Sequence, residues 1–334
     1  MADLAQKHAM SRIVGAHALP AEAAKDTVKR AIEAVRSHLG MDVAYVSEFV
    51  AGRSVFREVD APGLEALVKV GDSHSLDDVY CQHILEGRLP ELMPDTSAEP
   101  LAMALPITQA VPIGAHISVP IRLPDGRAYG MFCCLSFEPD RSLNKRDLQM
   151  MRAFADITAF EIDRDLEAVR DTEEKLARVR HAVDADGIAI LYQPIFSLED
   201  GRAVGLECLA RFSVEPARTP DVWFNEAAEV GLGTELEVAA IRRALNALRT
   251  LPADAYLAVN VSPPTLLSSE LAEALEGIPV ERIVLEVTEH ASVADYSDLF
   301  TALRPMRERG IRLAVDDPGA GYSSIRHILD LQPD

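Results

Sequence analysis

The chain of 334 residues is short of positive charge, with 33 Lys and Arg against 53 Asp and Glu and a formal net charge of −20. A protein that holds DNA or long RNA by neutralising phosphates needs a basic face, so this imbalance argues against nucleic acid as a partner. It argues equally against contact with an anionic membrane surface. A small anionic ligand is compatible with the charge, provided that metal ions or a few arginines supply local positive charge.

Long apolar runs and patterned cysteines are also missing. No apolar run is long enough to span a bilayer, and residues 1–20 lack the compact apolar core and basic lead of a secretory signal. The four cysteines, Cys81, Cys133, Cys134 and Cys208, show no disulfide-framework or zinc-ribbon spacing. These absences predict a cytoplasmic protein with reduced thiols and no membrane insertion.

Length and composition predict two globular domains, since 48% of the residues are hydrophobic and 26% are charged. After an N-terminal tail over 1–20, residues 21–166 read as helix, strands, helix, strands and helix, which predicts an α+β sheet domain. A helical linker is expected over 167–183. Over 184–334 strands and helices alternate, which predicts an α/β domain with a parallel sheet, open or closed into a barrel.

A long helical pattern runs from about Asn144 to Val183 without a proline or glycine. Two interpretations remain open for its apolar stripe. The helix either covers the sheet as a solvated surface helix or pairs with its twin in a homodimer.

Oxygen-bearing side chains stand at the ends of four successive apolar strands in the second domain. They are Glu207, Asn260, Glu286 and the pair Asp316-Asp317. In a parallel barrel such strand ends meet on the C-terminal face, where active sites lie. Carboxylate and amide oxygens suit hard cations, so the pattern predicts a site for Mg²⁺ or Mn²⁺.

Each of these residues has a structural explanation when it is taken alone. Glu207 or Glu286 would pair with a basic side chain, Asn260 would cap a loop, and the two aspartates would open a turn. Their occurrence together at four equivalent strand ends favours the metal site.

Six motifs in order resemble the EAL-domain cyclic di-GMP phosphodiesterases, over about Leu176 to Asp334. They are YQPI at 192–195, GLECLAR at 205–211, FNEAAE at 224–229, VNVS at 259–262, EVTE at 286–289 and DDPGAGYSS at 316–324. The resemblance implies an α/β, TIM-like barrel that hydrolyses cyclic di-GMP to pGpG with two ions of Mg²⁺ or Mn²⁺.

The resemblance also implies roles for individual residues. It gives the metal ligands as Glu207, Asn260, Glu286, Asp316 and Asp317. The catalytic set is Glu207, Asp316, Asp317 and Glu289, with Glu289 anchoring the loop after the double aspartate. Gln193 and Arg211 are placed near the dinucleotide.

The chain departs from the family pattern at several positions. Cys208 replaces the alanine that names the motif, and Pro318 and Ala320 replace Phe and Thr in the loop after the aspartates. The sequence stops before the strand that carries the family's catalytic lysine, so the barrel is expected to be incomplete in this chain. A fragment of a longer protein and a degenerate member are both open, and the intact motifs favour a fragment.

Residues 21–166 resemble a GAF sensor domain in element order and in the segment SVPIRLPDGRAYGMFCCLSF at 118–137. This implies an unknown small ligand. Cys81 near His83 invites a bilin-attachment interpretation, but an ordinary helix cysteine is favoured. The sequence therefore predicts a sensor-regulated cyclic di-GMP phosphodiesterase, with a catalytically inactive receptor or an interaction module as alternatives.

Overall fold

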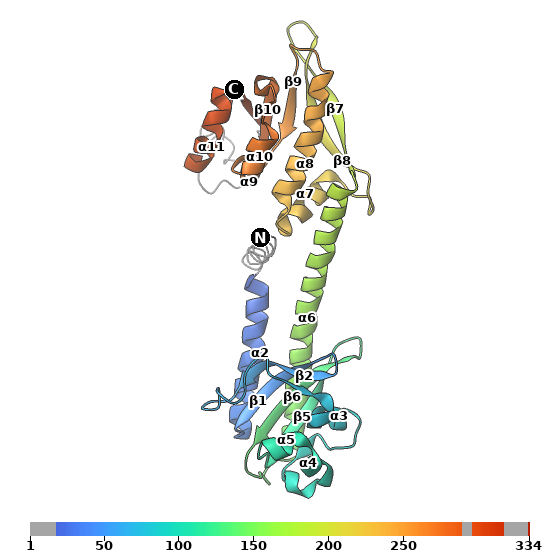
Figure 1. Cartoon of the computed structure of the whole chain (residues 1–334), viewed down its shortest axis with the longest axis vertical. Helices are drawn as coiled ribbons and strands as arrows, with labels where there is room; N and C mark the ends of the chain where they lie inside the picture. Colours follow the sequence, from blue (N-terminus) through green and yellow to red (C-terminus); the bar gives the residue numbers. More distant parts are fainter. Residues whose placement is uncertain (1–17, 289–295, 317–332) are drawn as a thin grey trace. The chain divides into compact units, whose positions relative to one another are not determined.

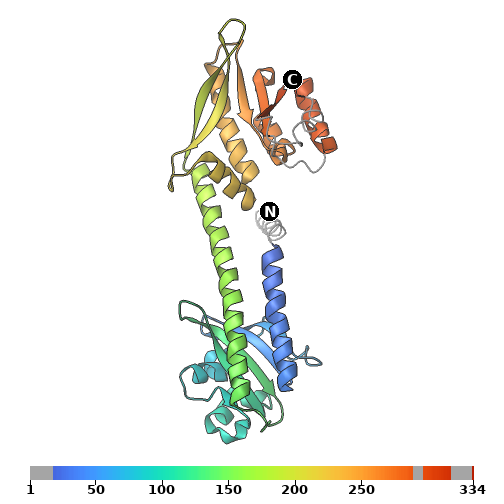
Figure 2. The ribbon, with the colours of Figure 1, turned by 180° about the vertical axis from the view of Figure 1, so that it is seen from behind.

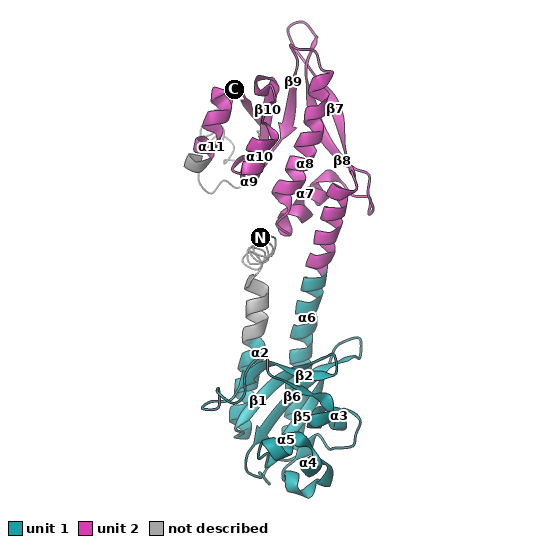
Figure 3. Ribbon diagram, in the orientation of Figure 1, with its two compact units in different colours: residues 1–170 teal, residues 171–334 magenta. Residues whose placement is uncertain are grey.

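The computed structural model of the chain describes residues 18–288, 296–316 and 333–334. It divides into two compact units, Met1–Arg170 and Asp171–Asp334 (Figure 3). Glu289 and Asp317 lie outside the described residues, and so does the side chain of Asp316.

The first unit is built on a six-stranded antiparallel sheet with the order β3-β2-β1-β6-β5-β4 (Figure 1). Its strands are β1 Val43–Val50, β2 Arg53–Asp60, β3 Ser73–Ser75, β4 Leu92–Met93, β5 Ala115–Arg122 and β6 Ala128–Ser136. Its helices are α2 Ala18–Leu39, α3 Tyr80–Leu85, α4 Pro100–Ala104, α5 Pro106–Ala110 and the start of α6 Lys145–Asp184.

Side chains alternate between the two faces of this sheet and build two separate cores. One face, which includes Cys134, packs against the apolar stripes of α2 and α6 (Figure 2). The other face, which includes Cys133, packs against α3, α4 and the segment around Ile113. Adjacent cysteines therefore serve different cores, as the period of two requires, and both are buried.

The hairpin between β1 and β2 turns at Ala51 and Gly52, which have φ angles of 48° and 77°. Two consecutive residues with positive φ form the tight turn that matches the twist of paired antiparallel strands. Strands β1 and β2 therefore form a tight β-hairpin.

The second unit carries a five-stranded sheet with the order β11-β10-β9-β8-β7. Its strands are β7 Ile188–Phe196, β8 Ala203–Phe212, β9 Tyr256–Asn260, β10 Ile283–Thr288 and β11 Arg312–Asp316. Its helices are the end of α6 with α7 Pro220–Glu229, α8 Gly233–Leu245, α9 Pro263–Leu266, α10 Ser269–Ala274 and α11 Tyr296–Glu308.

The prediction of a parallel sheet is right for β8 to β11 and wrong for β7, which pairs with β8 in antiparallel fashion. The reason lies in the connection. Only residues 197–202 join the two strands, whereas a parallel pair needs a crossover of a dozen or more residues. Gly201, with φ of 70°, supports the turn in this short link.

Helices α8 to α11 pack on one face of this sheet around Leu257, Leu285 and Leu313. The site described below lies on the other face of β8, β9 and β10. Asn260 ends β9 and Glu286 lies two residues before the end of β10. The prediction that a strand ends at Glu207 is wrong, because β8 continues to Phe212 in its pairing with β7. No helix in the described part of the chain is long and apolar enough to cross a membrane.

Candidate active site at the carboxyl edge of the second sheet

Strand register places the candidate residues of β8, β9 and β10 on one face. Glu207 lies opposite Ala258, which is two residues before Asn260, and Asn260 is itself the register partner of Glu286. Because side chains alternate along a strand, Glu207, Asn260 and Glu286 share the face opposite to Cys208, Val259 and Leu285. The latter three belong to the core under the helices, so the oxygen-bearing side chains lie on the side away from it.

Asn260 and Glu286 are held at the same level by the backbone. The amide of Val261 donates to the carbonyl of Glu286 over 2.9 Å, which extends the pairing one residue beyond the end of β9. Asn260 is exposed and Glu286 is half-buried. An amide and a carboxylate thus stand side by side, Asn260 at the end of β9 and Glu286 two residues before the end of β10.

The pKa of the Cys208 thiol depends on the carboxylates of Glu207 and Glu286. Burial, together with the negative charges of Glu286 and Glu207, raises the pKa of the Cys208 thiol to about 12. A thiol that both carboxylates influence must lie near both of them. Cys208 itself is buried in the core as a neutral packing residue.

Gln193 and Arg211 extend the same face. Gln193 on β7 lies directly opposite Glu207 in the antiparallel pair, and Arg211 follows Glu207 by four residues along β8. Both side chains are exposed, and the guanidinium of Arg211 donates to its neighbouring carbonyl, Ala210 O, over 2.7 Å. The guanidinium remains available as a donor to an anionic ligand, because it has five N–H groups.

A residue that sequence reasoning missed supports the loop after Asn260. One carboxylate oxygen of Glu237, on α8, accepts from the amide and the hydroxyl of Ser262, each over 2.9 Å. The resulting bonds fix the chain two residues after Asn260. No sequence signal marks Glu237, because it precedes Ser262 by 25 residues within an ordinary amphipathic helix.

A cavity of about 390 Å³ lies between β8, β9, α7 and α8, on the side of the sheet that carries Cys208 and Val259, and Glu207 and Glu286 are not among its described lining residues. Arg211, Asn225, Glu237 and Asn260 give it polar character beside apolar side chains. The volume lies within the range of small-molecule sites.

Gly205 lies two residues before Glu207 against the ring of Tyr256. A Cβ atom at Gly205 would stand 2.7 Å from a ring carbon of Tyr256, so only glycine leaves room for that ring. The guanidinium of Arg312 stacks on the same ring at 4.5 Å from its centroid. These contacts explain the glycine of the GLECLAR motif in packing terms.

The described residues bring together Glu207, Asn260 and Glu286, with Gln193 and Arg211 on the same face. They contain no cluster of three or more His, Cys, Asp or Glu that could hold a metal ion. Asp317 and Glu289 are outside the described residues. Of Asp316 the strand position is described: it pairs with Thr288, two residues beyond the Ala314 that faces Glu286.

Comparison with known proteins gives two family matches. Residues 24–162 match the model of the GAF domain, and residues 176–334 match that of the EAL domain. Both resemblances noted in the sequence are therefore confirmed.

Individual relatives match about half of the chain. The chain is 30% identical over 181 residues to the probable cyclic di-GMP phosphodiesterase PdeB of Escherichia coli, covering 51% of this chain and 35% of PdeB. It is 33% identical over 180 residues to the cyclic di-GMP phosphodiesterase NbdA of Pseudomonas aeruginosa, covering 50% of this chain and 23% of NbdA. The chain thus spans about a third or less of these relatives.

Among solved structures, the YkuI protein of Bacillus subtilis, with an EAL domain in complex with substrate cyclic di-GMP and calcium, is 29% identical. The match has a TM-score of 0.40 and covers 49% of this chain and 42% of YkuI. By the two family matches, residues 24–162 are a GAF domain and residues 176–334 are an EAL domain.

Proposed function

We propose that the second unit is the catalytic part of a metal-dependent phosphodiesterase that hydrolyses cyclic di-GMP to pGpG. The observation that carries this proposal is the shared face of Glu207, Asn260 and Glu286 on the neighbouring parallel strands β8, β9 and β10. Relatives named for this activity match about half of the chain.

The donor set fits two hard divalent cations, Mg²⁺ or Mn²⁺. Carboxylate and amide oxygens are the ligands that such ions prefer, and two carboxylates near one another need a counter-charge. Glu207, Asn260 and Glu286 would hold the ions together with Asp316 and Asp317. Bound there, the ions would lower the pKa of a water and polarise the phosphate oxygens.

Arg211 and Gln193 are proposed to orient the dinucleotide. A guanidinium binds a phosphate through charge-assisted, often paired hydrogen bonds, and a carboxamide both donates and accepts. Their place on the same face as Glu207 would set a bound phosphate beside the metal ligands. Glu289 is proposed to act on the loop that follows Asp317.

The test uses the full-length protein with cyclic di-GMP, and products are separated by chromatography with Mg²⁺, with Mn²⁺ and with EDTA. We expect pGpG only when metal is present. Glu207→Gln should reduce turnover at least 100-fold, since it removes a charged ligand, whereas Glu273→Gln on the exposed surface of α10 should leave turnover unchanged. Binding of cyclic di-GMP without turnover under all metal conditions would instead identify a receptor.

We also propose that the first unit is a sensor and that the protein works as a homodimer. Ile157 and Phe160, one turn apart on α6, are 53% and 64% exposed, which makes an apolar surface that a second copy would cover. Light scattering of the full-length protein should show a dimer, and Phe160→Glu should convert it to a monomer. A monomer for the unchanged protein at tens of micromolar, a range that detects modest affinity, would contradict the dimer.

A further inference from the structure

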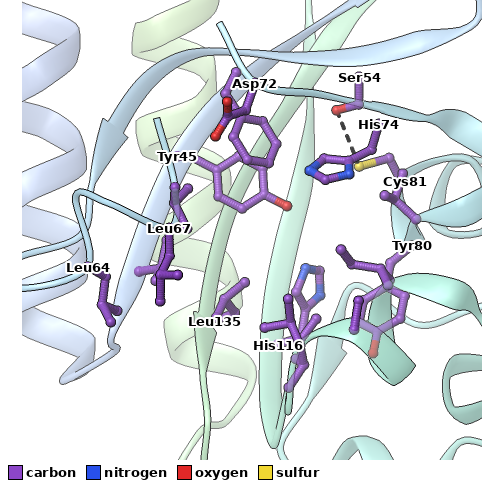
Figure 4. A pocket seen from close by; sticks show the side chains of 18 of the residues that line it. Tyr45, Ser54, Leu64, Leu67, Asp72, His74, Tyr80, Cys81, His116 and Leu135 are labelled. Atoms are coloured by element: carbon purple, nitrogen blue, oxygen red, sulfur yellow. Dashed lines mark hydrogen bonds between the residues drawn. The ribbon is translucent and has the colours of Figure 1, made fainter. Parts of the chain in front are cut away.

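The first unit contains a cavity of about 600 Å³ between the sheet and the segments that cover its second face (Figure 4). Strands β1, β2 and β5, helices α3 and α5, and residues 64–74 contribute to its lining. A cavity of this volume accepts an organic molecule of two or three rings.

Aromatic rings stand around the cavity. Tyr45 and Phe56 lie with ring centroids 4.3 Å apart, and Phe56 in turn lies 5.5 Å from His74. The rings of Tyr80 and His116 meet edge to face at 4.9 Å. Such a lining favours a flat ligand, because aromatic rings gain from stacked or edge-to-face contact beyond the area they bury.

His116 brings a polar group into this apolar space. Its imidazole is 3% exposed and is directed into the cavity (Figure 4), and within the described part of the chain its Nδ1 atom has no hydrogen-bond partner. Burial lowers the pKa of His116 to about 3, so the ring is neutral at physiological pH. A ligand that hydrogen-bonds this imidazole would relieve a buried, unsatisfied polar group.

The imidazole of His116 is held in place by Tyr80. Tyr80, whose ring meets it at 90°, is itself fixed by a 2.6 Å hydrogen bond between its hydroxyl and that of Thr108. Thr108 donates to the carbonyl of Ala102 over 2.5 Å. The polar group is thus preorganised for a ligand, which reduces the entropy cost of binding.

The charge of the cavity excludes anions. Among the described residues that line it there is no Lys or Arg, and Asp72 is the one carboxylate. A phosphate or carboxylate placed here would lose its hydration without gaining a cationic partner. A cyclic nucleotide monophosphate is therefore disfavoured as the ligand.

Access is provided along the segment between β2 and β3. Leu67 lines the cavity and is nevertheless 74% exposed, so the cavity opens to solvent where this residue stands. Leu64 and Val68, which are both half-buried, also line the cavity in this segment.

We propose that this cavity binds an uncharged, planar aromatic molecule that carries a hydroxyl or N–H group, and that this group hydrogen-bonds the imidazole of His116. The proposal rests on the sensor role given above to the first unit, and it names the chemical class of the ligand. It does not depend on hydrolysis of cyclic di-GMP by the second unit.

Three probes with one ring system test the proposal by isothermal titration of the full chain. They are 2-naphthol, which is neutral and carries a hydroxyl, naphthalene, which lacks it, and 2-naphthoate, which is an anion. We expect 2-naphthol to bind about tenfold more tightly than naphthalene, because one hydrogen bond to a buried group contributes about this factor to the affinity. 2-Naphthoate should bind at least tenfold more weakly than 2-naphthol.

His116→Phe isolates the hydrogen bond, because phenylalanine keeps a ring beside Tyr80. In this variant 2-naphthol should fall to the affinity of naphthalene, and naphthalene should change less than twofold. His38→Phe, the same substitution at an exposed position on α2, should leave all three affinities unchanged. Circular dichroism and naphthalene binding together report whether the His116→Phe cavity is intact.

The proposal is overturned if 2-naphthoate binds as tightly as 2-naphthol, if His116→Phe leaves 2-naphthol affinity unchanged, or if none of the probes binds at 1 mM, a concentration that detects very weak affinity. Turnover of cyclic di-GMP is assayed separately. If the protein hydrolyses cyclic di-GMP but binds none of the probes, only the proposed ligand class is refuted. If it binds the probes as expected but does not hydrolyse cyclic di-GMP, only the catalytic proposal is refuted.

Discussion

Arg178, near the end of α6, donates from Nη2 to Oε1 of Glu226 on α7 over 3.0 Å, and Arg218 pairs with the same carboxylate. Glu226 is buried, and its two arginines are partly so. One carboxylate thus joins two helices and a loop within the second unit. Breaking such a site leaves buried charge without a partner, which costs more than losing a surface pair.

Glu226→Gln should therefore destabilise the second unit by about 2 kcal/mol at pH 7, the scale of hydrogen bonds to a charged group. Urea unfolding measures this change. Glu229→Gln on the same helix is the matched control, because Glu229 is 53% exposed in its pair with Lys175. That change should cost less than about 1 kcal/mol.

The same carboxylate predicts an acid dependence. Burial raises the pKa of Glu226, but the hydrogen bonds and charges of Arg178 and Arg218 outweigh burial and hold it below the usual 4.5. A depressed pKa contributes stability that is present above pH 4.5 and is lost as the pH falls through the folded value. The stability difference between Glu226→Gln and the unchanged protein should therefore shrink below pH 4.5, and a constant difference would contradict the ion pairs.

His116 predicts an acid dependence of the same sign in the first unit, at higher pH. Its folded pKa of about 3 lies below the unfolded value of 6.5, so the unfolded chain takes up a proton between these values and the folded chain does not. Stability should then fall by about 1.4 kcal/mol per pH unit as the pH drops below 6.5. Hydrogen exchange of β5 and β6 amides at pH 7, 6 and 5 would show this slope, and His116→Phe should remove it while His38→Phe retains it.

Gly205→Ala should destabilise the second sheet by about 1–3 kcal/mol, since the new methyl group would overlap the ring of Tyr256. The pairing of Gly205 with Tyr256 allows a rescue experiment. In a Tyr256→Leu background the same Ala substitution should cost less than 1 kcal/mol, because a leucine side chain fills less of that space. Equal costs in both backgrounds would show that the ring is not the obstacle.

Arg211→Gln should raise the KM of the full-length protein for cyclic di-GMP about 10- to 100-fold, the loss of a charge-assisted contact to phosphate. The kcat value should change much less, because the guanidinium is proposed to position the substrate rather than to react. Arg202→Gln is the control, since Arg202 is exposed and pairs only locally with Asp200. An effect on kcat alone would assign Arg211 a different role.

The helices and strands follow from local patterns that the sequence displays. The apolar spacing between Val28 and Leu39 predicts a helix that is observed, and the alternation through Val43 to Val50 predicts β1. The direction of β7 is different, because it depends on the length of one connection and not on the pattern within the strand. This is why the prediction of an all-parallel sheet is wrong at β7.

The shared face of Glu207, Asn260 and Glu286 was predictable because apolar strands can be recognised one at a time and parallel pairing brings their polar residues together. The hydrogen bonds that Glu237 accepts from Ser262 and the cavity around His116 could not be predicted, because each depends on side chains that are distant in the chain. No period or motif connects Tyr45 to His116. Their proximity arises from the order of strands in the sheet, with β1 and β5 on either side of β6.

The alternation of Cys133 and Cys134 between two cores has a consequence for how this protein family can diverge. Along β1, β5 and β6, every second residue lies on the face of the sheet that carries the cavity, and the residues between them face α2 and α6. Substitutions that change the shape or polarity of the cavity therefore do not disturb the packing of the helices on the other face of the same strands. New ligand preferences can accumulate in the first unit while the helices that border it keep their original contacts.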